Sequence, residues 1–240
     1  MQTPWNLFMP ANPICVALDT PDLDRAVALA RALKPHVGYM KVGMEFFYAH
    51  GTAGYEKVAG IGLPIFLDLK LHDIPNTVAQ GLKSLMRLAP PPVIVNIHAT
   101  GGLDMMKAAR DAVGGEAKLI AVTILTSLSD QDIFKIGFDA FSTDRHAAAL
   151  ARLALTAGLD GVVCSPKDLR RIRKDLPRNF LTVVPGIRPE GSDAQDQKRV
   201  ATPQAALAAG ADILVIGRAI TGAADPAKAA QDILAGLHAG

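Results

Sequence analysis

Two acids and a base lie close together in the segment FLDLKLHDIPNT, residues 66–77: Asp68, Lys70 and Asp73. The segment starts as an apolar strand and ends as the start of a helix, where Pro75 suits the first turn. An isolated buried ion pair is a poor stabiliser, because desolvation offsets the attraction between its charges. Three ionisable groups at one strand end therefore favour a site that moves protons or stabilises charge over a structural salt bridge.

The alternation of side chains along a strand divides this segment into two faces. Asp68 and Lys70 are two positions apart, so we expect them to share the face that points toward the centre of the fold. We expect Leu67, Leu69 and Leu71 on the opposite face, packed against helices.

The two carboxylates of this cluster could instead bind Mg²⁺ through oxygen ligands. Lys70 lies between Asp68 and Asp73 in the sequence, and Lys41 comes from the preceding predicted strand. An ammonium group can occupy the position that a metal cation would take, so the two lysines favour a site without metal. On the residues alone, the magnesium alternative stays open.

The rest of the chain alternates short β-branched apolar runs with Ala- and Leu-rich helical stretches. Continuous apolar strands are typical of a parallel sheet that helices cover. Eight such strands, each followed by a helix, predict a single α/β domain over residues 1–240, a (β/α)8 TIM barrel. An open doubly wound sheet is the alternative, but no GxGxxG follows the first strand. The predicted strands are 14–19, 39–43, 64–70, 93–99, 118–125, 161–165, 181–187 and 213–218.

Polar residues gather at the carboxyl ends of these strands, which is where TIM barrels place their active sites. His72 and His98 have no Cys or Ser arranged around them for a catalytic triad, so we expect structural roles for both. The polar and glycine positions at the strand ends are Asp19, Lys41, Asp68, Lys70, Asn96, His98, Thr126, Ser127, Arg188, Gly217 and Arg218.

The loops after the seventh and eighth strands predict a phosphate site, as in many TIM barrels. Arg188 and Arg218 can supply charge-assisted hydrogen bonds, and the small residues of GRAIT leave backbone N–H groups accessible. Surface ion pairs are the alternative for both arginines. Residues 186–203 are rich in Gly, Pro, Ser and charge, so we expect a mobile loop that closes over the phosphate.

Composition argues against several classes of protein. The formal net charge is +2, and the basic run 167–178 has acids and leucines at helical spacing, which predicts an amphipathic helix and no nucleic-acid partner. No apolar run could span a bilayer and the first residues lack a secretory signal, so we expect a cytoplasmic protein without a membrane partner. Cys15 and Cys164 lie in apolar runs and are expected to be core thiols.

The segment DLKLHDIPNT matches the D-x-K-x-x-D-I-P-N-T signature of the orotidine 5′-phosphate decarboxylase family, and the chain resembles that family over nearly its whole length. Further matches follow in the family's order: VALD, KVGMEFF, VNIHATGG, AVTILTS, PGIRPEG with DQKR, and IGRAIT. The resemblance implies decarboxylation of orotidine 5′-phosphate to UMP and CO₂ in pyrimidine biosynthesis, with no cofactor and no metal. It also implies a homodimer whose active sites lie at the subunit interface.

The resemblance implies a role for each site residue. Lys70 would protonate C6 of the pyrimidine as CO₂ leaves, in a charge network with Lys41, Asp68 and Asp73. Asp68 would lie against the substrate carboxylate, and Asp19 and Lys41 would bind ribose hydroxyls. The other implied substrate-binding residues are Thr126 and Ser127 at the pyrimidine, Arg188, Gln197, Gly217 and Arg218 at the phosphate, Asp73 and Thr77 in the partner's site, and Leu69, Leu71, His72, Ile74, Pro75, Asn76 and Pro185.

Two alternatives remain. Two related enzymes, 3-keto-gulonate-phosphate decarboxylase and hexulose-phosphate synthase, share D-x-K-x-x-D but use Mg²⁺, carry an acid in place of Lys41 and lack the I-P-N-T continuation. Lys41 and residues 74–77 therefore favour the metal-free decarboxylase. The other alternative is a non-catalytic nucleotide-binding barrel, and the intact Lys70 and Asp73 argue against it.

Overall fold

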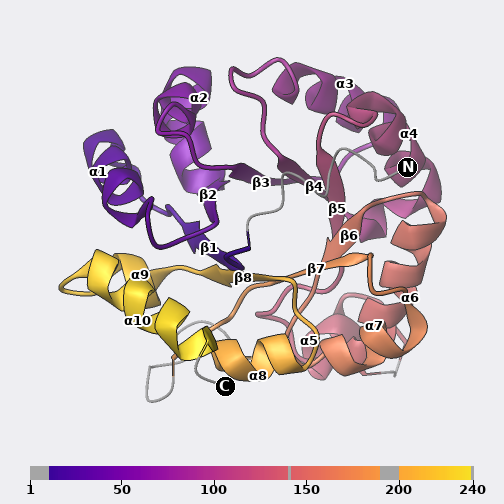
Figure 1. Cartoon of the computed structure of the whole chain (residues 1–240). Helices are drawn as coiled ribbons and strands as arrows, with labels where there is room; N and C mark the ends of the chain where they lie inside the picture. Colours follow the sequence, from indigo (N-terminus) through magenta and orange to yellow (C-terminus); the bar gives the residue numbers. More distant parts are fainter. Residues whose placement is uncertain (1–10, 140–141, 190–199, 239–240) are drawn as a thin grey trace, which may run out of the picture.

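The computed structural model describes residues 11–139, 142–189 and 200–238. Eight parallel strands pair in sequence order and close into a barrel, and helices surround it (Figure 1). The predicted TIM barrel is therefore confirmed, and the open doubly wound sheet is excluded because β1 pairs with β8. The strands are β1 (Ile14–Ala17), β2 (Tyr39–Gly43), β3 (Ile65–Leu71), β4 (Ile94–His98), β5 (Lys118–Val122), β6 (Gly161–Val163), β7 (Leu181–Val184) and β8 (Ile213–Ile216).

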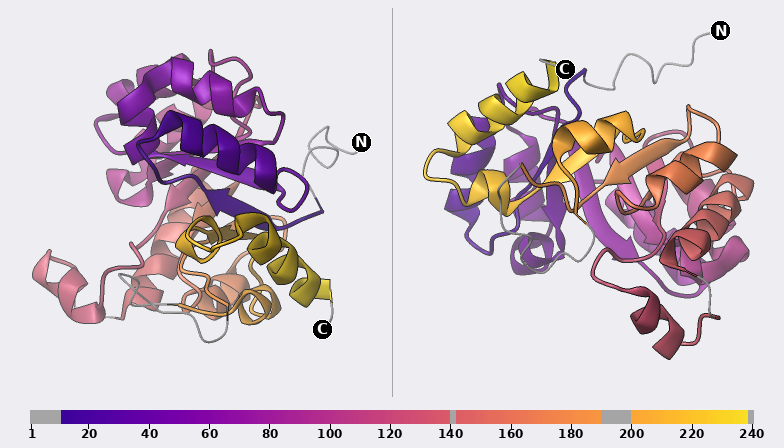
Figure 2. Two further views of the ribbon diagram at one scale, coloured as in Figure 1. Left: turned by 90° about the vertical axis from the view of Figure 1, so that its left-hand side faces the viewer. Right: turned by 90° about the horizontal axis from the view of Figure 1, so that it is seen from below.

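The helices follow the strands in the order that a (β/α)8 fold requires, and two further views show them outside the strands (Figure 2). Short α5 stands away from the body of the barrel in both of these views (Figure 2). No helix within the described residues is long and apolar enough to cross a membrane. The α-helices are α1 (Leu23–Leu33), α2 (Met44–Ala59), α3 (Pro75–Leu85), α4 (Gly102–Val113), α5 (Asp130–Lys135), α6 (Thr143–Thr156), α7 (Leu169–Asp175), α8 (Pro203–Ala208), α9 (Arg218–Thr221) and α10 (Pro226–His238), and a 3-10 turn, η2 (Ala99–Gly101), precedes α4.

Strand alternation produces two apolar cores. In β1, Val16 belongs to the large core between the strands and the helices, whereas Cys15 belongs to a smaller core inside the barrel. In β3, Leu67 belongs to the outer core and Phe66 to the inner one. The inner core fills the barrel interior below the carboxyl ends of the strands, that is, toward their amino ends. Polar side chains can therefore gather only at the carboxyl ends. Both cysteines are buried free thiols, as predicted.

Most predicted strands extend too far at their carboxyl ends. β1 ends at Ala17 rather than at Asp19, and β5 ends at Val122 rather than at residue 125. The apolar run continues past the last ladder pair because the residues that follow are still covered, as Ile124 is. Burial alone therefore cannot locate the point at which the chain leaves the sheet.

The basic run 167–178 forms a helix as predicted, but its cationic face is not fully solvated. In α7, Leu169 and Ile172 are buried, and the guanidinium of Arg173 is buried with them. Arg173 forms an ion pair with Asp212 and donates to the Thr182 hydroxyl (2.7 Å). This arginine therefore ties α7 to β7 and to the residue preceding β8.

Candidate active site

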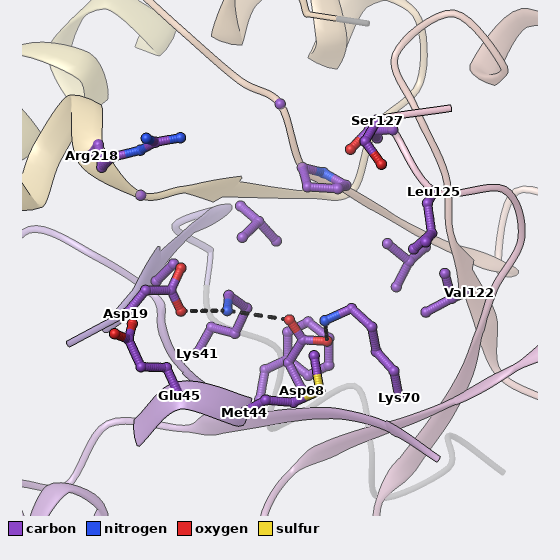
Figure 3. Close-up of a pocket in the computed structure, with 18 of the residues that line it drawn as sticks. Asp19, Lys41, Met44, Glu45, Asp68, Lys70, Val122, Leu125, Ser127 and Arg218 are labelled. Carbon is purple, nitrogen blue, oxygen red and sulfur yellow. Dashed lines mark hydrogen bonds and ion pairs between the residues drawn. The ribbon is translucent and has the colours of Figure 1, made fainter. Parts of the chain in front are cut away.

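A cavity of about 730 Å³ opens at the carboxyl ends of the barrel strands. This volume lies within the range typical of small-molecule sites. The close-up in Figure 3 shows the charged residues of β2 and β3 at one wall, with Arg218 and Ser127 reaching in from the opposite side. The cavity brings together these predicted site residues: Asp19, Lys41, Asp68, Lys70, Thr126, Ser127, Pro185, Arg188, Gly217 and Arg218.

Four of these residues form a continuous chain of alternating charge (Figure 3). The Lys41 ammonium lies 3.0 Å from Asp19 Oδ1 and 3.2 Å from Asp68 Oδ2. The Lys70 ammonium lies 2.8 Å from Asp68 Oδ1. Lys41 and Asp68 are only 8% and 7% exposed, so solvent screens their interaction weakly. Lys41, Asp68 and Lys70 of the predicted network are thus joined, and Asp19 extends the chain, whereas Asp73 takes no part in it within one subunit.

The charges set the ionisation of the two buried members. Burial raises the pKa of Asp68, but the positive charges of Lys41 and Lys70, together with hydrogen bonds from Lys70 and Asn96, outweigh it and hold the pKa below its ordinary value. Burial lowers the pKa of Lys41, but the charges of Asp68 and Asp19 and hydrogen bonds to them outweigh it and raise the pKa. Asp68 is therefore an anion and Lys41 a cation at neutral pH.

The lowered pKa of Asp68 predicts a component of stability that disappears in acid. This component is present above the pKa of an unfolded aspartate, about 3.9, and is lost as the pH falls through the folded value. Urea unfolding between about pH 7 and pH 2.5 should show that the wild type loses more free energy of unfolding than Asp68→Asn. Equal losses in the two proteins would mean that Asp68 is not held ionised by its partners.

Lys70 has an unusual backbone conformation, with φ of 53°. It is the one non-glycine residue with a positive φ among the described residues. The pairing of β3 with β4 shifts register between Leu67 and Leu71, so a bulge separates the regular part of β3 from its end. Asp68 and Lys70 share the cavity as predicted, although the pairing with β4 is irregular between them. Leu67, Leu69 and Leu71 face the outer core, as predicted.

The opposite side of the cavity carries the predicted phosphate residues. Arg218 begins α9 directly after Gly217, and Arg188 follows β7. Both arginines line the cavity, and Arg218 lies on the Asp19 side in Figure 3. Two cations and a glycine turn at one end of a cavity can hold a dianion.

The ends of the predicted 186–203 loop lie close together. Arg188 donates its backbone N–H to the Ala201 carbonyl (3.0 Å), and Ile187 and Ala201 form an isolated bridge. Helix α8 begins at Pro203, the last residue of the predicted loop. Gln197 and the middle of this loop lie outside the described residues.

Eight described residues implied to bind substrate do not line the cavity of their own chain: Leu69 and Leu71 pack against the outer core, and the other six are residues 72–77. Asp73 is exposed, and its carboxylate accepts the backbone N–H of Ile74 (2.7 Å). Ile74 itself is 67% exposed, which is unusual for a large aliphatic side chain. Pro75 occupies the first turn of α3, as predicted. The six form one exposed surface: His72, Asp73, Ile74, Pro75, Asn76 and Thr77.

His98 and His72 pack together at the start of this surface, with ring centroids 5.3 Å apart. Burial, assisted by the nearby His72 and Lys70, lowers the pKa of His98. A neutral imidazole at the end of β4 fits the structural role expected from the sequence.

Several cavity residues were not identified from the sequence. Met44 and Glu45 follow β2 directly, at the same carboxyl edge as Lys41, and the rule that found the other residues would also have found them. Most of the others are apolar, and an apolar strand residue gives no local sign of whether it faces a cavity or a core. They include Phe66, Val122, Ile124, Leu125, Val163 and Val215.

Residues 12–233 match the family model described as "Orotidine 5′-phosphate decarboxylase / HUMPS family". The chain is 50% identical over 227 residues to the orotidine 5′-phosphate decarboxylase of Erythrobacter litoralis, and 53% identical over 227 residues to that of Novosphingobium aromaticivorans. Each alignment covers 95% of this chain and 100% of the relative. The crystal structure of orotidine 5′-phosphate decarboxylase from Lactobacillus acidophilus superposes with a TM-score of 0.81 at 37% identity, covering 94% of this chain and 99% of the other.

Proposed function

Because the chain belongs to the orotidine 5′-phosphate decarboxylase / HUMPS family, we propose that it is the carboxy-lyase that converts orotidine 5′-phosphate to UMP and CO₂ in pyrimidine biosynthesis. One observation carries the proposal. The charge chain Asp19–Lys41–Asp68–Lys70 lines the same cavity as Arg188 and Arg218. A nucleotide whose pyrimidine carries a carboxylate needs both parts of this cavity: the charge chain at the pyrimidine and the two arginines at the phosphate.

The reaction demands stabilisation of a localised negative charge. When the bond between C6 and the carboxylate breaks, its electron pair stays on C6 in an orbital outside the π-system of the ring. The Lys70 ammonium can stabilise this charge and then deliver its proton to C6, so that CO₂ leaves and UMP remains. The products of the step are CO₂, UMP and a neutral Lys70 amine, and solvent then reprotonates the amine.

Asp68 and Lys41 hold Lys70 in position. Asp68 contacts the Lys70 ammonium through Oδ1 and the Lys41 ammonium through Oδ2. In the substrate complex, Asp68 would lie against the carboxylate that is lost. Repulsion between the two anions would weaken substrate binding at that point and disappear as CO₂ leaves.

Lys41 and Asp19 lie at the end of the charge chain farther from Lys70, and in Figure 3 Arg218 lies on the same side of the view as Asp19. Here they would bind the ribose hydroxyls, between the reacting base and the phosphate. The side of the cavity near Lys70 is formed by Val122, Leu125 and Ser127 (Figure 3). Apolar side chains with a hydroxyl beside them suit a flat pyrimidine with polar edges.

Lys70 alone cannot account for catalysis. One charge contact contributes about 4 kcal/mol at an effective dielectric constant near 20. Enzymes lower barriers by roughly 8–23 kcal/mol. We assign much of the remainder to phosphate binding by Arg188 and Arg218, which would close the 186–203 loop over the cavity and expel water.

The charge chain supports a reaction without metal. Lys41 occupies the position between Asp19 and Asp68, with its ammonium within 3.2 Å of both carboxylates. Mg²⁺ bound there would have to displace a buried ammonium that the same carboxylates stabilise. The magnesium-dependent sugar-phosphate lyases of the same family are the second candidate, and D-x-K-x-x-D is the feature that favours them.

We also propose that the enzyme is a homodimer with shared active sites. The exposed surface 72–77 adjoins β3, which carries Asp68 and Lys70. An exposed Ile74 beside a catalytic strand is typical of a surface that a partner covers. In the dimer, Asp73 and Thr77 would complete the site of the other subunit.

A substrate panel tests this function. The purified enzyme, treated with a chelator, should convert orotidine 5′-phosphate and leave the sugar phosphates of the magnesium-dependent enzymes unchanged. Turnover of a sugar phosphate that appears only when Mg²⁺ is restored would instead support the second candidate. Binding of UMP without turnover of any substrate would support a non-catalytic barrel.

Arg218→Ala should weaken ligands that carry a phosphate by about 10- to 100-fold, because charge-assisted hydrogen bonds contribute roughly 1.5–3 kcal/mol. Calorimetric titration with UMP and with uridine measures this directly, and the affinity for uridine should change little. Arg31→Ala, on the exposed face of α1, is the matched control. An equal loss for UMP and uridine would contradict the phosphate role of Arg218.

A further inference from the structure

Asn96 is a fully buried amide in the middle of β4, at 0% exposure. Its Nδ2 donates to Asp68 Oδ1 over 2.7 Å, and its Oδ1 accepts the backbone N–H of Lys70 over 2.8 Å. On the other side, β4 pairs regularly with β5, and Asn96 lies opposite the apolar Ile120. Both ends of the amide are therefore directed at β3.

These two hydrogen bonds lie at the bulge of β3. The flanking pairs are Leu67 with Val95 and Leu71 with Ile97, so residues 68–70 lie opposite Asn96 alone. A bulge leaves backbone groups without a partner in the ladder, and a buried N–H without a partner is costly. The Asn96 side chain supplies the acceptor that the backbone of β4 does not offer to Lys70.

The backbone of Lys70 needs this support. Its φ of 53° is in the left-handed region, which is unfavourable for a residue with a Cβ atom. Such a conformation persists only where the surroundings hold it, and it is common at functional sites. Through Asp68 Oδ1, Asn96 also acts on the side chain of Lys70, because that oxygen accepts from both Asn96 Nδ2 and the Lys70 ammonium.

We propose that Asn96 is a positioning residue, which fixes the bulged backbone of Lys70 and the carboxylate of Asp68 so that the Lys70 ammonium is aimed at the reacting carbon. This inference rests on the proposed function, since it assigns Asn96 to the proton-delivery step. Asn96 is not among the residues that line the cavity. Its effect should therefore fall on the chemical step, with little effect on nucleotide affinity.

Asn96→Leu tests the proposal, because leucine keeps a similar volume and removes both hydrogen bonds. The variant should lower kcat by about 100-fold, the cost of misplacing a reacting group by roughly 1 Å, with KM for orotidine 5′-phosphate and Kd for UMP nearly unchanged. A kcat equal to that of the wild type would overturn the proposal. So would a loss that falls equally on kcat and on UMP affinity.

Thr182→Val is the matched control. Thr182 is also fully buried on a barrel strand, and its hydroxyl donates to the Gly210 carbonyl (2.9 Å) at the amino end of β7, away from the cavity. It should lower the melting temperature without lowering kcat. If Asn96→Leu and Thr182→Val lose activity in proportion to their losses of stability, Asn96 has no positioning role.

Asn96→Asp is a second variant, which preserves the shape of the side chain if leucine does not fold. The carboxyl group introduced at position 96 can donate to Asp68 only when it is protonated. The kcat of this variant relative to that of the wild type should therefore rise as the pH falls. A ratio near one at every pH would overturn the proposal. These failures differ from a failure of the proposed function, in which the wild type itself would show no turnover.

Discussion

Replacing Lys70 with alanine should lower kcat for orotidine 5′-phosphate by roughly 10⁴-fold or more, because this one residue is proposed to supply both the proton and the charge that stabilises the carbanion. Proton delivery alone typically contributes about 10²- to 10⁴-fold, and a fixed stabilising charge about 10²- to 10³-fold. The affinity for UMP should fall little, since the arginines that would bind the phosphate are unaffected. Steady-state kinetics and UMP titration together measure the two effects.

Lys57→Ala is the control for Lys70→Ala. Lys57 is an exposed lysine in the last turn of α2, far from the carboxyl ends of the strands. It should leave both kcat and UMP affinity unchanged. If Lys70→Ala kept more than about a hundredth of the wild-type kcat, Lys70 would not be the proton donor, because general acids of this kind contribute at least that much.

Asp73→Asn should lower kcat by about 100-fold, even though Asp73 lies outside the cavity of its own chain. The reason is that the negative charge of Asp73 is proposed to act beside Lys70 of the partner subunit. The melting temperature should change little, because the Asp73 carboxylate is exposed and accepts the backbone N–H of the next residue, a local bond that an amide oxygen can also accept.

Mixing the two variants separates a shared site from a site built by one chain. A dimer of one Lys70→Ala subunit and one Asp73→Asn subunit has one site with both defects and one site with neither. Random assortment makes about half of the dimers mixed, and each mixed dimer has one intact site of two. About a quarter of all sites should therefore regain activity, as two-fold symmetry requires. If Asp73 acted in its own chain, no site would be intact and the mixture would stay inactive.

The barrel and most of its polar edge were predictable because both follow from short-range patterns. Eight apolar strands at regular spacing determine the fold, and the rule that strand ends carry the chemistry then identifies Asp19, Lys41 and Arg218 without further information. Met44 and Glu45 could have been found in the same way. The pattern does not distinguish Val122 in the cavity wall from a core valine, because that difference depends on the curvature of the closed barrel.

The conformation of Lys70 was not predictable from local sequence. Alternation places Asp68 and Lys70 on one face, but it does not reveal the bulge, the positive φ of Lys70 or the hydrogen bond from its backbone N–H to Asn96, 26 residues away along the chain. The sequence does contain one sign, which is a polar amide in the centre of the apolar run VIVNIHA. Its meaning becomes clear only when β3 and β4 are paired. The roles of Asp73 and Thr77 depend on a second subunit and remain predictions.

The most direct measurement is a single reaction in D₂O with wild-type enzyme, a chelator and orotidine 5′-phosphate labelled with ¹³C in its carboxylate. Metal-free decarboxylation with proton delivery from an exchangeable lysine predicts one labelled CO₂ for each UMP, and deuterium at C6 of that UMP. The absence of labelled CO₂ in the chelated reaction would contradict the central proposal that the fixed charges of this barrel alone catalyse the decarboxylation.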